Sequence, residues 1–298
     1  MTAAQEGIFV EGSAQNHFLE YRVGDGARDG ELRDALAAGL GQARAKGQHL
    51  VAAFGDSLWR RLAPGPVPSG LRPFDALGEP AGHYAPATQR DIWLWLQAPA
   101  QDANFDLALA LHRALAPIAE LELEIAGFKY RGERDLIGFV DGTGNPKDRA
   151  AQEAAALIPD GGGGAFLMTQ QWVHDLPKFN DLGVEAQEKV VGRTKIEDVE
   201  LEGEAMPADS HVSRTDVTED GVAMKVYRRS SPYGGARQHG LYYVAFACDL
   251  YRFDIQLKRM YGLAGDGLSD RLIEFSRAVT GAYWYAPGTG DLSAVFGG

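Results

Sequence analysis

The sequence predicts an α+β protein built from two similar halves. In both halves, segments with the spacing of strands alternate with segments that have the spacing of helices. The predicted helices carry their apolar residues on one face, which is typical of helices that pack on one side of a sheet. The similarity of the two halves lies in this pattern and not in residue identity.

The first half begins with two strands, predicted at residues 18–23 and 50–54, on either side of a helix. Asp29 is a candidate N-cap for this helix. Its apolar face consists of Leu32, Leu36, Leu40 and Ala43. Residues 91–96 are apolar on both faces, which favours a central strand covered on both sides. A second helix follows, marked at helical spacing by Leu107, Leu111, Leu115 and Ile118.

The second half repeats this order. Strands are predicted at three apolar segments, residues 165–169, 222–228 and 241–247. The next segment predicts a helix that ends at Gly262 and is marked by Phe253, Leu257 and Tyr261. A second helix is predicted from Leu268, Leu272, Phe275 and Val279, with Ser269 near its start. Residues 282–286 form the last predicted strand.

Charge and composition exclude several classes of protein. The 41 acidic residues outnumber the 29 basic ones, so a nucleic-acid partner is not expected. No apolar run approaches the ~20 residues that a membrane helix needs. No basic residue precedes Arg22, unlike in a secretory or transit leader. We therefore expect a soluble, cytoplasmic protein. Its single cysteine excludes a disulfide framework and a Cys-rich metal cluster.

The stretch at residues 138–146, GFVDGTGNP, carries the strongest local signal. Asp141 lies among three glycines, an asparagine and a proline, directly after the apolar pair Leu136 and Ile137. Glycines permit turn conformations that other residues resist. A carboxylate at the edge of a core is also poorly hydrated, so its proton affinity can be tuned. The alternative interpretation is a tight turn in which Asp141 is merely a capping residue.

Two further segments complete a candidate site. His211 lies in a polar segment before a predicted strand, and Arg228 and Arg229 follow at that strand's end. Taken singly, each is more often an ordinary hydrogen-bonded or solvated side chain. The seven histidines include no HExxH motif, so a zinc site is unsupported. Together, a histidine, a carboxylate and an arginine can serve haem, as axial ligand, proton carrier and stabilising cation.

These segments resemble the dye-decolorizing peroxidase family. Residues 138–142 match its GxxDG signature, and Thr143, Asn145 and Pro146 extend the match. Further matching segments follow in the same order, at residues 192–195, 210–212, 227–230 and 278–281. The compact length is most similar to the bacterial cytoplasmic subgroup called type B or the P class. The resemblance implies two ferredoxin-like subdomains of the dimeric α+β barrel type, at residues 1–132 and 133–298, with haem b in the second.

The resemblance also implies roles for individual residues. His211 would be the proximal iron ligand, Asp141 the distal acid–base residue, and Arg228 the distal arginine near peroxide and a haem propionate. Ser230 would line the distal pocket and Arg193 would pair with a propionate. Asp270, with Glu274 as its rival, would accept a hydrogen bond from His211; it could equally be no more than a helix N-terminal residue. Further haem contacts would come from the turn, through Gly142, Thr143, Gly144 and Asn145.

One position departs from the family pattern. Many members of the subgroup have Glu where this chain has Gly144, which puts manganese oxidation in doubt but leaves the chemistry of Asp141 intact. The implied function is a haem peroxidase that reduces hydrogen peroxide and oxidises dyes or phenolics by one-electron steps through an oxo-ferryl intermediate. Trp172 and Trp284 are candidates for electron relay, and a homo-oligomer is expected. The alternatives are a haem- or porphyrinogen-handling protein and a ferredoxin-like binding module without a cofactor.

Overall fold

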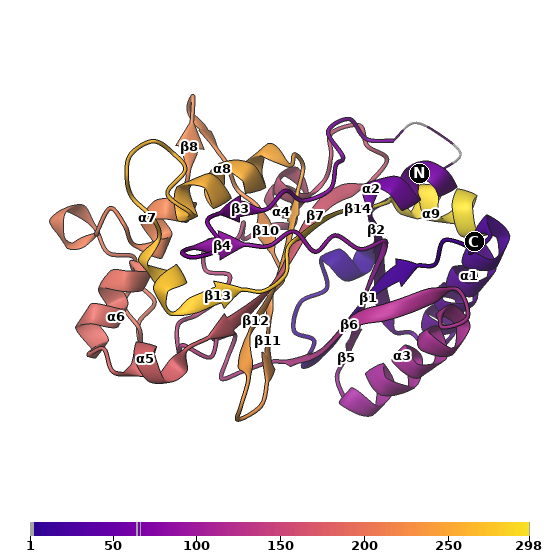
Figure 1. Cartoon of the computed structure of the whole chain (residues 1–298), viewed down its shortest axis with the longest axis horizontal. Coiled ribbons are helices and arrows are strands. Elements are labelled where there is room, and N and C mark those ends of the chain that lie inside the picture. The colour runs from indigo at the N-terminus through magenta and orange to yellow at the C-terminus, as the bar shows by residue number, and fades with distance from the viewer. Residues whose placement is uncertain (1–2, 64, 66, 298) are drawn as a thin grey trace.

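Strands from both halves of the chain meet in one large sheet. The computed structural model describes residues 3–63, 65 and 67–297, and its main sheet has ten strands within these ranges. Figure 1 shows most of the N-terminal half on the right and most of the C-terminal half on the left, with helices on the outside. The predicted α+β class with antiparallel sheets is therefore confirmed.

The first half forms a four-stranded antiparallel sheet in the order β6-β1-β5-β2. These strands are β1 (Gln15–Val23), β2 (His49–Phe54), β5 (Ile92–Ala98) and β6 (Ala119–Phe128). Helix α1 (Asp29–Ala45) joins β1 to β2, and helix α3 (Gln101–Leu115) joins β5 to β6. This order, with one helix in each of the two connections, is the ferredoxin-like arrangement.

The second half repeats that arrangement in the order β11-β12-β7-β14. Its strands are β7 (Ala165–His174), β11 (Ser231–Gly234), β12 (His239–Ala247) and β14 (Ala282–Ala286). Helix α8 (Tyr251–Met260) follows β12. Three short helices lie between β7 and β11, namely α5 (Leu176–Asn180), α6 (Val184–Val191) and α7 (His211–Thr215). Both ferredoxin-like halves expected from the sequence are thus present.

The two halves close into a barrel through two narrow seams. One seam pairs β11 with β6 at Tyr233 and Gly127, and the other pairs β14 with β2 at Tyr285 and Phe54. Because β7 also pairs with β12, the eight strands form a closed circuit. Gly127 allows the first seam to form, since a Cβ there would lie 2.4 Å from the Ser231 hydroxyl oxygen.

The barrel interior is filled mainly by aromatic side chains. Every strand of the circuit contributes at least one residue to this inner cluster, which includes Trp93, Trp95, Tyr242, Phe246 and Trp284. A second cluster lies between the outer faces of the strands and the helices that cover them. Alternate residues of a strand point to opposite faces, so each barrel strand contributes to both the inside and the outside.

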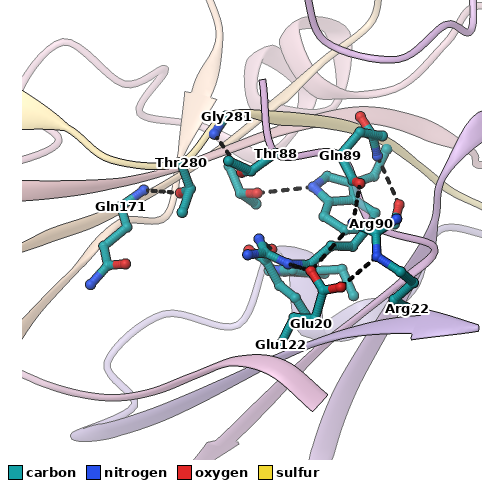
Figure 2. Close-up of polar contacts among 12 residues, drawn as sticks. Glu20, Arg22, Thr88, Gln89, Arg90, Glu122, Gln171, Thr280 and Gly281 are labelled. Carbon is teal, nitrogen blue, oxygen red and sulfur yellow. Dashed lines mark hydrogen bonds and ion pairs between the residues drawn. The ribbon is translucent and has the colours of Figure 1, made fainter. Parts of the chain in front are cut away.

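A buried carboxylate links the barrel interior to the surface. Glu20 in β1 is 1% exposed; it accepts hydrogen bonds from Tyr242 inside the barrel and from Arg90. Arg90 also pairs with Glu122, which is joined to Arg22 at the surface (Figure 2). Burial raises the pKa of Glu20, and the Arg90 guanidinium opposes that rise. The Arg90 guanidinium therefore compensates the negative charge of the Glu20 carboxylate at a site that water does not reach.

Smaller elements connect the barrel strands. The short strands are β3 (Leu77–Gly78), β4 (Tyr84–Ala85), β8 (Thr218–Glu219), β9 (Val222–Ala223), β10 (Tyr227–Arg228) and β13 (Ser276–Ala278). The remaining α-helices are α2 (Asp56–Leu62), α4 (Arg149–Ala156) and α9 (Thr289–Phe296). Three 3-10 helices occur in the described residues, η1 (Glu6–Ile8), η2 (Gly203–Ala205) and η3 (Arg271–Glu274). No helix of the described chain has the length and apolar character needed to cross a bilayer.

Three local predictions are wrong. Asp29 is the first residue of α1, and the N-cap is Arg28. The strand predicted at 222–228 is divided into β9 and β10, because the first of these turns back to pair with β8. The helix predicted around Leu272 and Phe275 is instead η3 followed by β13, since Ser276 and Ala278 pair with β7 at its edge. The sequence analysis also assigned no strand to residues 119–128, where β6 lies.

Candidate active site

A cavity of about 320 Å³ lies against the outer face of β7 and β12. Its floor is formed by alternate residues of these strands, Met168, Gln170, Trp172, Leu241 and Tyr243. Side chains from α7, α8 and η3 line another part of the wall, and the turn that carries Asp141 also contributes to it. A mostly apolar recess with a few polar groups is typical of a cofactor site.

His211 is the first residue of α7, and its ring is held by a buried carboxylate. Its Nδ1 donates a hydrogen bond of 2.6 Å to Oδ2 of Asp270, which is fully buried. The other carboxylate oxygen accepts from the backbone N–H of Leu272 at 2.8 Å, so Asp270 also caps η3. The Nε2 atom of His211 has no hydrogen-bond partner among the described residues and is available to a ligand in the cavity.

Helix α7 is held against α8 by two arginines. Arg214 is 1% exposed; it donates to the Arg259 carbonyl oxygen and binds the carboxylate of Asp266 through both terminal nitrogens. Arg259 in turn donates to the carbonyl oxygens of Ser213 and Arg214. The side chain of Ser210 accepts from the Ser213 N–H at the N-terminus of α7. These contacts fix the backbone that carries His211.

Asp141 lies in the turn formed by residues 138–146. Gly138 and Gly142 have φ angles of +93° and +83°, which a residue with a Cβ rarely adopts. Burial raises the pKa of Asp141, while the nearby Arg228 opposes the rise and the Asp135 carboxylate adds to it. The side chain keeps 26% of its surface free, and that surface faces cavities on both sides of the turn. Asp141 is thus a carboxyl group with an unusually high proton affinity.

Arg228 in β10 faces Asp141 without hydrogen bonding to it. Its Nε lies 3.8 Å from Oδ1 of Asp141, and this buried atom has no hydrogen-bond partner among the described residues. The backbone of Arg228 is fixed by Asn145, whose amide donates to its carbonyl oxygen at 2.8 Å and accepts from its N–H at 3.0 Å. An unpaired buried donor beside a carboxylate is well placed to bind a polar ligand.

Arg193 lines the cavity, and each of its three nitrogens already makes one hydrogen bond. It bonds to the carboxylates of Asp198 at 2.9 Å and Glu200 at 2.8 Å, and to the Asp198 carbonyl oxygen. Thr143 donates to the same Asp198 carboxylate at 2.5 Å, which connects this cluster to the turn. Because a guanidinium has five N–H donors, a propionate would bind Arg193 beside two carboxylates that already neutralise its charge.

The remaining sequence candidates fall into two groups. Thr143 and Gly144 line the main cavity, and a Cβ at Gly144 would lie 3.5 Å from an Arg228 terminal nitrogen. Three others line a second cavity of about 410 Å³ behind the turn, namely Gly142, Asn145 and Ser230. Asp141 and Arg228 line both cavities. Of the two tryptophan candidates, Trp172 lines the main cavity and Trp284 lies inside the barrel.

The polar residues of the cavity wall that were not predicted from the sequence include Asp135, His174, Tyr243 and Ser276. The alternation along β7 could have indicated His174, because residues 168, 170, 172 and 174 share one face of a strand. Burial raises the pKa of Tyr243 to about 12, so its phenol stays protonated at neutral pH. Asp135 and Ser276 have no comparable signal in the sequence.

Comparisons with protein-family models cover nearly the whole chain. Residues 5–129 match the model of the N-terminal domain of Dyp-type peroxidases. Residues 132–291 match the model of their C-terminal domain.

Curated relatives and solved structures agree with these matches. A dye-decolorizing peroxidase of Mycobacterium tuberculosis is 35% identical over 274 residues, which cover 87% of this chain and 82% of the relative. One from Rhodococcus erythropolis is 34% identical, covering 91% of this chain and 82% of the relative. The structure of DypB from Rhodococcus jostii superposes with a TM-score of 0.92 at 33% identity, covering 98% of each chain. The dye-decolorizing protein from Vibrio cholerae gives a TM-score of 0.89 at 34% identity, covering 98% of this chain and 99% of that one.

Proposed function

Because this chain belongs to the Dyp-type peroxidase family, we propose that it is a haem peroxidase in which His211 binds the iron and Asp141 and Arg228 act on hydrogen peroxide. The observation that carries this proposal is the arrangement of the main cavity. The Nδ1 of His211 is tied to Asp270, which leaves Nε2 for the cavity, while Asp141 and Arg228 line the same cavity as an acid–base pair.

The residues present suit haem b. Neutral histidine nitrogen is a common axial ligand, and a carboxylate hydrogen bonded to its other nitrogen makes it more basic. The apolar floor of the cavity suits the porphyrin faces, and the unpaired Nε of Arg228 suits an anionic or polar group. Structures of Rhodococcus jostii DypB variants contain haem. Bound haem would supply an iron that binds peroxide and holds the oxidising equivalents taken from it.

Asp141 and Arg228 would divide the remaining work between them. As a carboxylate, Asp141 would accept the proton from one oxygen of hydrogen peroxide and return it to the other, which then leaves as water. The guanidinium of Arg228 would stabilise the negative charge that develops as the O–O bond breaks. Ser230 lines the cavity behind the turn, from which it could contact Asp141 or Arg228 through water. Small aromatic donors would then supply electrons one at a time.

Other residues around the turn would contribute to haem binding in different ways. Thr143 and Gly144 would approach the porphyrin edge directly, whereas Gly142 and Asn145 would act by shaping the turn and fixing Arg228. Arg193 would bind a propionate through the N–H donors that Asp198 and Glu200 leave free. No observation favours the alternative, a haem- or porphyrinogen-handling protein. The division at residues 132 and 133 is supported by the ferredoxin-like order of each half, while the cytoplasmic location and the homo-oligomer stay predictions.

Replacing Asp141 tests the proposed proton transfer. Asp141→Asn should slow the reaction with peroxide about 10²-fold or more, because an amide cannot carry the proton. In the wild-type protein the rate should fall as the pH drops through the pKa of Asp141. The pH of this fall, the acid limb of the rate profile, should lie above the ordinary pKa of an Asp side chain because the pKa of Asp141 is raised. Stopped-flow absorbance of the haem-loaded protein measures both effects, with exposed Asp181→Asn as the control.

The ligand assignment has its own readout. His211→Ala should lose most of the haem absorption band that the wild-type protein shows, since no other histidine holds its ring toward the cavity with a free nitrogen among the described residues. An unchanged spectrum would remove His211 from the iron. Wild-type peroxide rates in Asp141→Asn would leave Asp141 a structural role only.

A further inference from the structure

Asp135, His174 and Ser276 form a hydrogen-bonded chain in the cavity wall. Nδ1 of His174 lies 2.7 Å from the Ser276 hydroxyl, and Nε2 lies 3.1 Å from the Asp135 carboxylate. All three residues are less than a tenth exposed, and all three line the cavity with His211 and Asp141. Because both ring nitrogens are engaged, His174 is held in one orientation and is not available as an iron ligand.

The chain is assembled by strand register. His174 is the last residue of β7 and lies directly opposite Ser276, the first residue of β13. This pairing fixes the imidazole between the edge of the sheet and the segment that carries Asp135. His174 therefore connects a rigid strand to the turn that carries Asp141.

Asp135 and Asp141 belong to the same compact segment. The backbone N–H of Asp135 donates to the Phe139 carbonyl oxygen, and the Gly138 N–H donates to the Asp135 carbonyl oxygen. The N–H of Leu136 also donates to the Asp135 side chain at 2.6 Å. These bonds fix the backbone between the two residues, so the charge of one acts on the other from within the same compact segment.

The charged and titratable groups around Asp141 come from several elements. Arg228 in β10 favours its ionised form, whereas Asp135 in the same segment disfavours it. The phenol of Tyr243 in β12 also lies close enough to interact with Asp141. Across the cavity, the charge of Arg193 is matched by Asp198 and Glu200. Among these groups, Asp135 carries a negative charge like that of ionised Asp141, and the buried His174 holds its side chain in place.

We propose that Asp135, fixed by His174 and Ser276, is a positioning residue whose negative charge helps to hold the proton that Asp141 carries. The inference rests on the proposed role of Asp141 as the proton carrier. Asp135 does not touch peroxide; it acts by keeping a proton on Asp141 over a wider pH range. Its charge therefore places the acid limb of the peroxide reaction at higher pH than Asp141 and Arg228 alone would.

Asp135→Asn tests this role, because it removes the charge and keeps the shape and the acceptor oxygen. The pH at which the rate of the peroxide reaction falls should be lower in the variant. At a pH below the fall of the wild-type rate, the variant should therefore keep a several-fold larger fraction of its own high-pH rate than the wild-type protein does. The matched control is Asp181→Asn, which removes an exposed carboxylate outside the cavity and should keep the wild-type limb. An unchanged limb in Asp135→Asn, or an equal shift in Asp181→Asn, would overturn the proposal.

A measurement independent of activity separates this inference from the proposed function. Infrared titration of the resting haem-loaded protein follows the protonated carboxyl band of Asp141, identified by its loss in Asp141→Asn. That band should titrate at lower pH in Asp135→Asn even if Asp141 proves not to limit the peroxide reaction; a band that titrates at the same pH would contradict the proposal.

Variants of His174 give the same test if Asp135→Asn does not fold. His174→Phe removes the imidazole that orients the buried Asp135 carboxylate and leaves only the Leu136 N–H to hold it, so its charge is no longer fixed beside Asp141. The Asp141 band should then move to lower pH, whereas His174→Gln, which keeps a donor, should restore the wild-type titration. No difference between the Phe and Gln variants would overturn the role of His174.

Discussion

At the residue scale, Asp270 combines two tasks in one carboxylate. One oxygen holds the ring of His211 and the other caps η3, so the orientation of the ligand and the local backbone depend on each other. From the sequence, Asp270 could either lie beside His211 or stand at a helix N-terminus. In the structure the two roles coexist, because the two oxygens of a carboxylate point in different directions.

Asp270→Asn should weaken haem binding by about 10- to 100-fold, the usual cost of losing a carboxylate behind a metal-bound histidine. Asparagine is a good N-cap, so the fold around η3 should be kept. The measurement is the rate of haem transfer to an excess of a haem-scavenging protein. Glu274→Gln is the control, and equal loss in both variants would speak against a specific role of Asp270.

Motif residues were the easiest part of the site to predict. The GxxDG turn has an unusual composition in the sequence itself, whereas His211 and Arg228 are ordinary when taken singly and gained their roles from that turn and from the family resemblance. The partners of Arg193 were not predicted, because Asp198 and Glu200 are ordinary acidic residues until a loop brings them to the guanidinium. Asp135 and His174 were missed for the same reason, since 39 positions separate them along the chain.

At the element scale, α7 shows how a very short helix can carry a ligand. A helix of five residues is not stable alone in water. The buried Arg214 and the neighbouring Arg259 hold it to α8 through backbone carbonyls and Asp266. The position of His211 therefore depends on contacts made three residues further along the chain.

Arg214→Met should lower the free energy of unfolding by about 1–3 kcal/mol, because a buried carbonyl and a charge-assisted pair lose their donor. It should also speed haem loss without changing the distal residues. Thermal unfolding and haem transfer measure the two effects. Asp266→Asn, which changes only the more exposed partner, should cost less; a larger effect from Asp266→Asn would show that Arg214 is not the residue that holds α7.

Helices and strands were predicted correctly where the apolar pattern of a segment agreed with the elements that cover it or pair with it. The strand at 91–96 was predicted because its residues are apolar on both faces. In the structure, β5 is buried along its whole length. The helix predicted across Leu272 and Phe275 was wrong because four apolar residues at helical spacing can also arise from a 3-10 turn followed by an edge strand. Pairing with β7 decided between these structures, and that pairing is not encoded locally.

At the scale of the whole molecule, a polar chain crosses the wall of an aromatic barrel. Glu20, Arg90, Glu122 and Arg22 connect the interior to the solvent, as Figure 2 shows. Arg90 is the central member, since it bonds to both carboxylates. Removing one partner of a buried pair is costly, because the other charge is left without compensation.

Arg90→Met should destabilise the protein by about 3–5 kcal/mol, as expected for a buried carboxylate that loses its cation. The double variant Arg90→Met with Glu20→Met should recover part of this loss. The matched control is Arg22→Met, which breaks the exposed end of the chain and should cost at most about 1 kcal/mol. Denaturant unfolding monitored by fluorescence compares the three, and equal costs for Arg90→Met and Arg22→Met would contradict the buried role of Arg90.

Closure of the barrel was the part of the fold that the residues alone could not predict. The sequence pattern indicates two similar halves, and the family resemblance implies a barrel type. The two seams, however, rest on single residue pairs at Gly127 and Phe54. Such pairs leave no periodic signal, since one residue is too short a stretch to show alternation.

The alternation along β7 also limits how proteins of this kind can evolve. Its even-numbered residues from Met168 to His174 form the cavity, while Ala165 and Leu167 belong to the barrel interior. A one-residue insertion or deletion in β7 would turn the cavity residues toward the barrel interior and the interior residues toward the cavity, and so disrupt both. Changes of substrate preference should therefore arise by substitution at the even positions, and length variation among descendants should collect in the loops around the cavity.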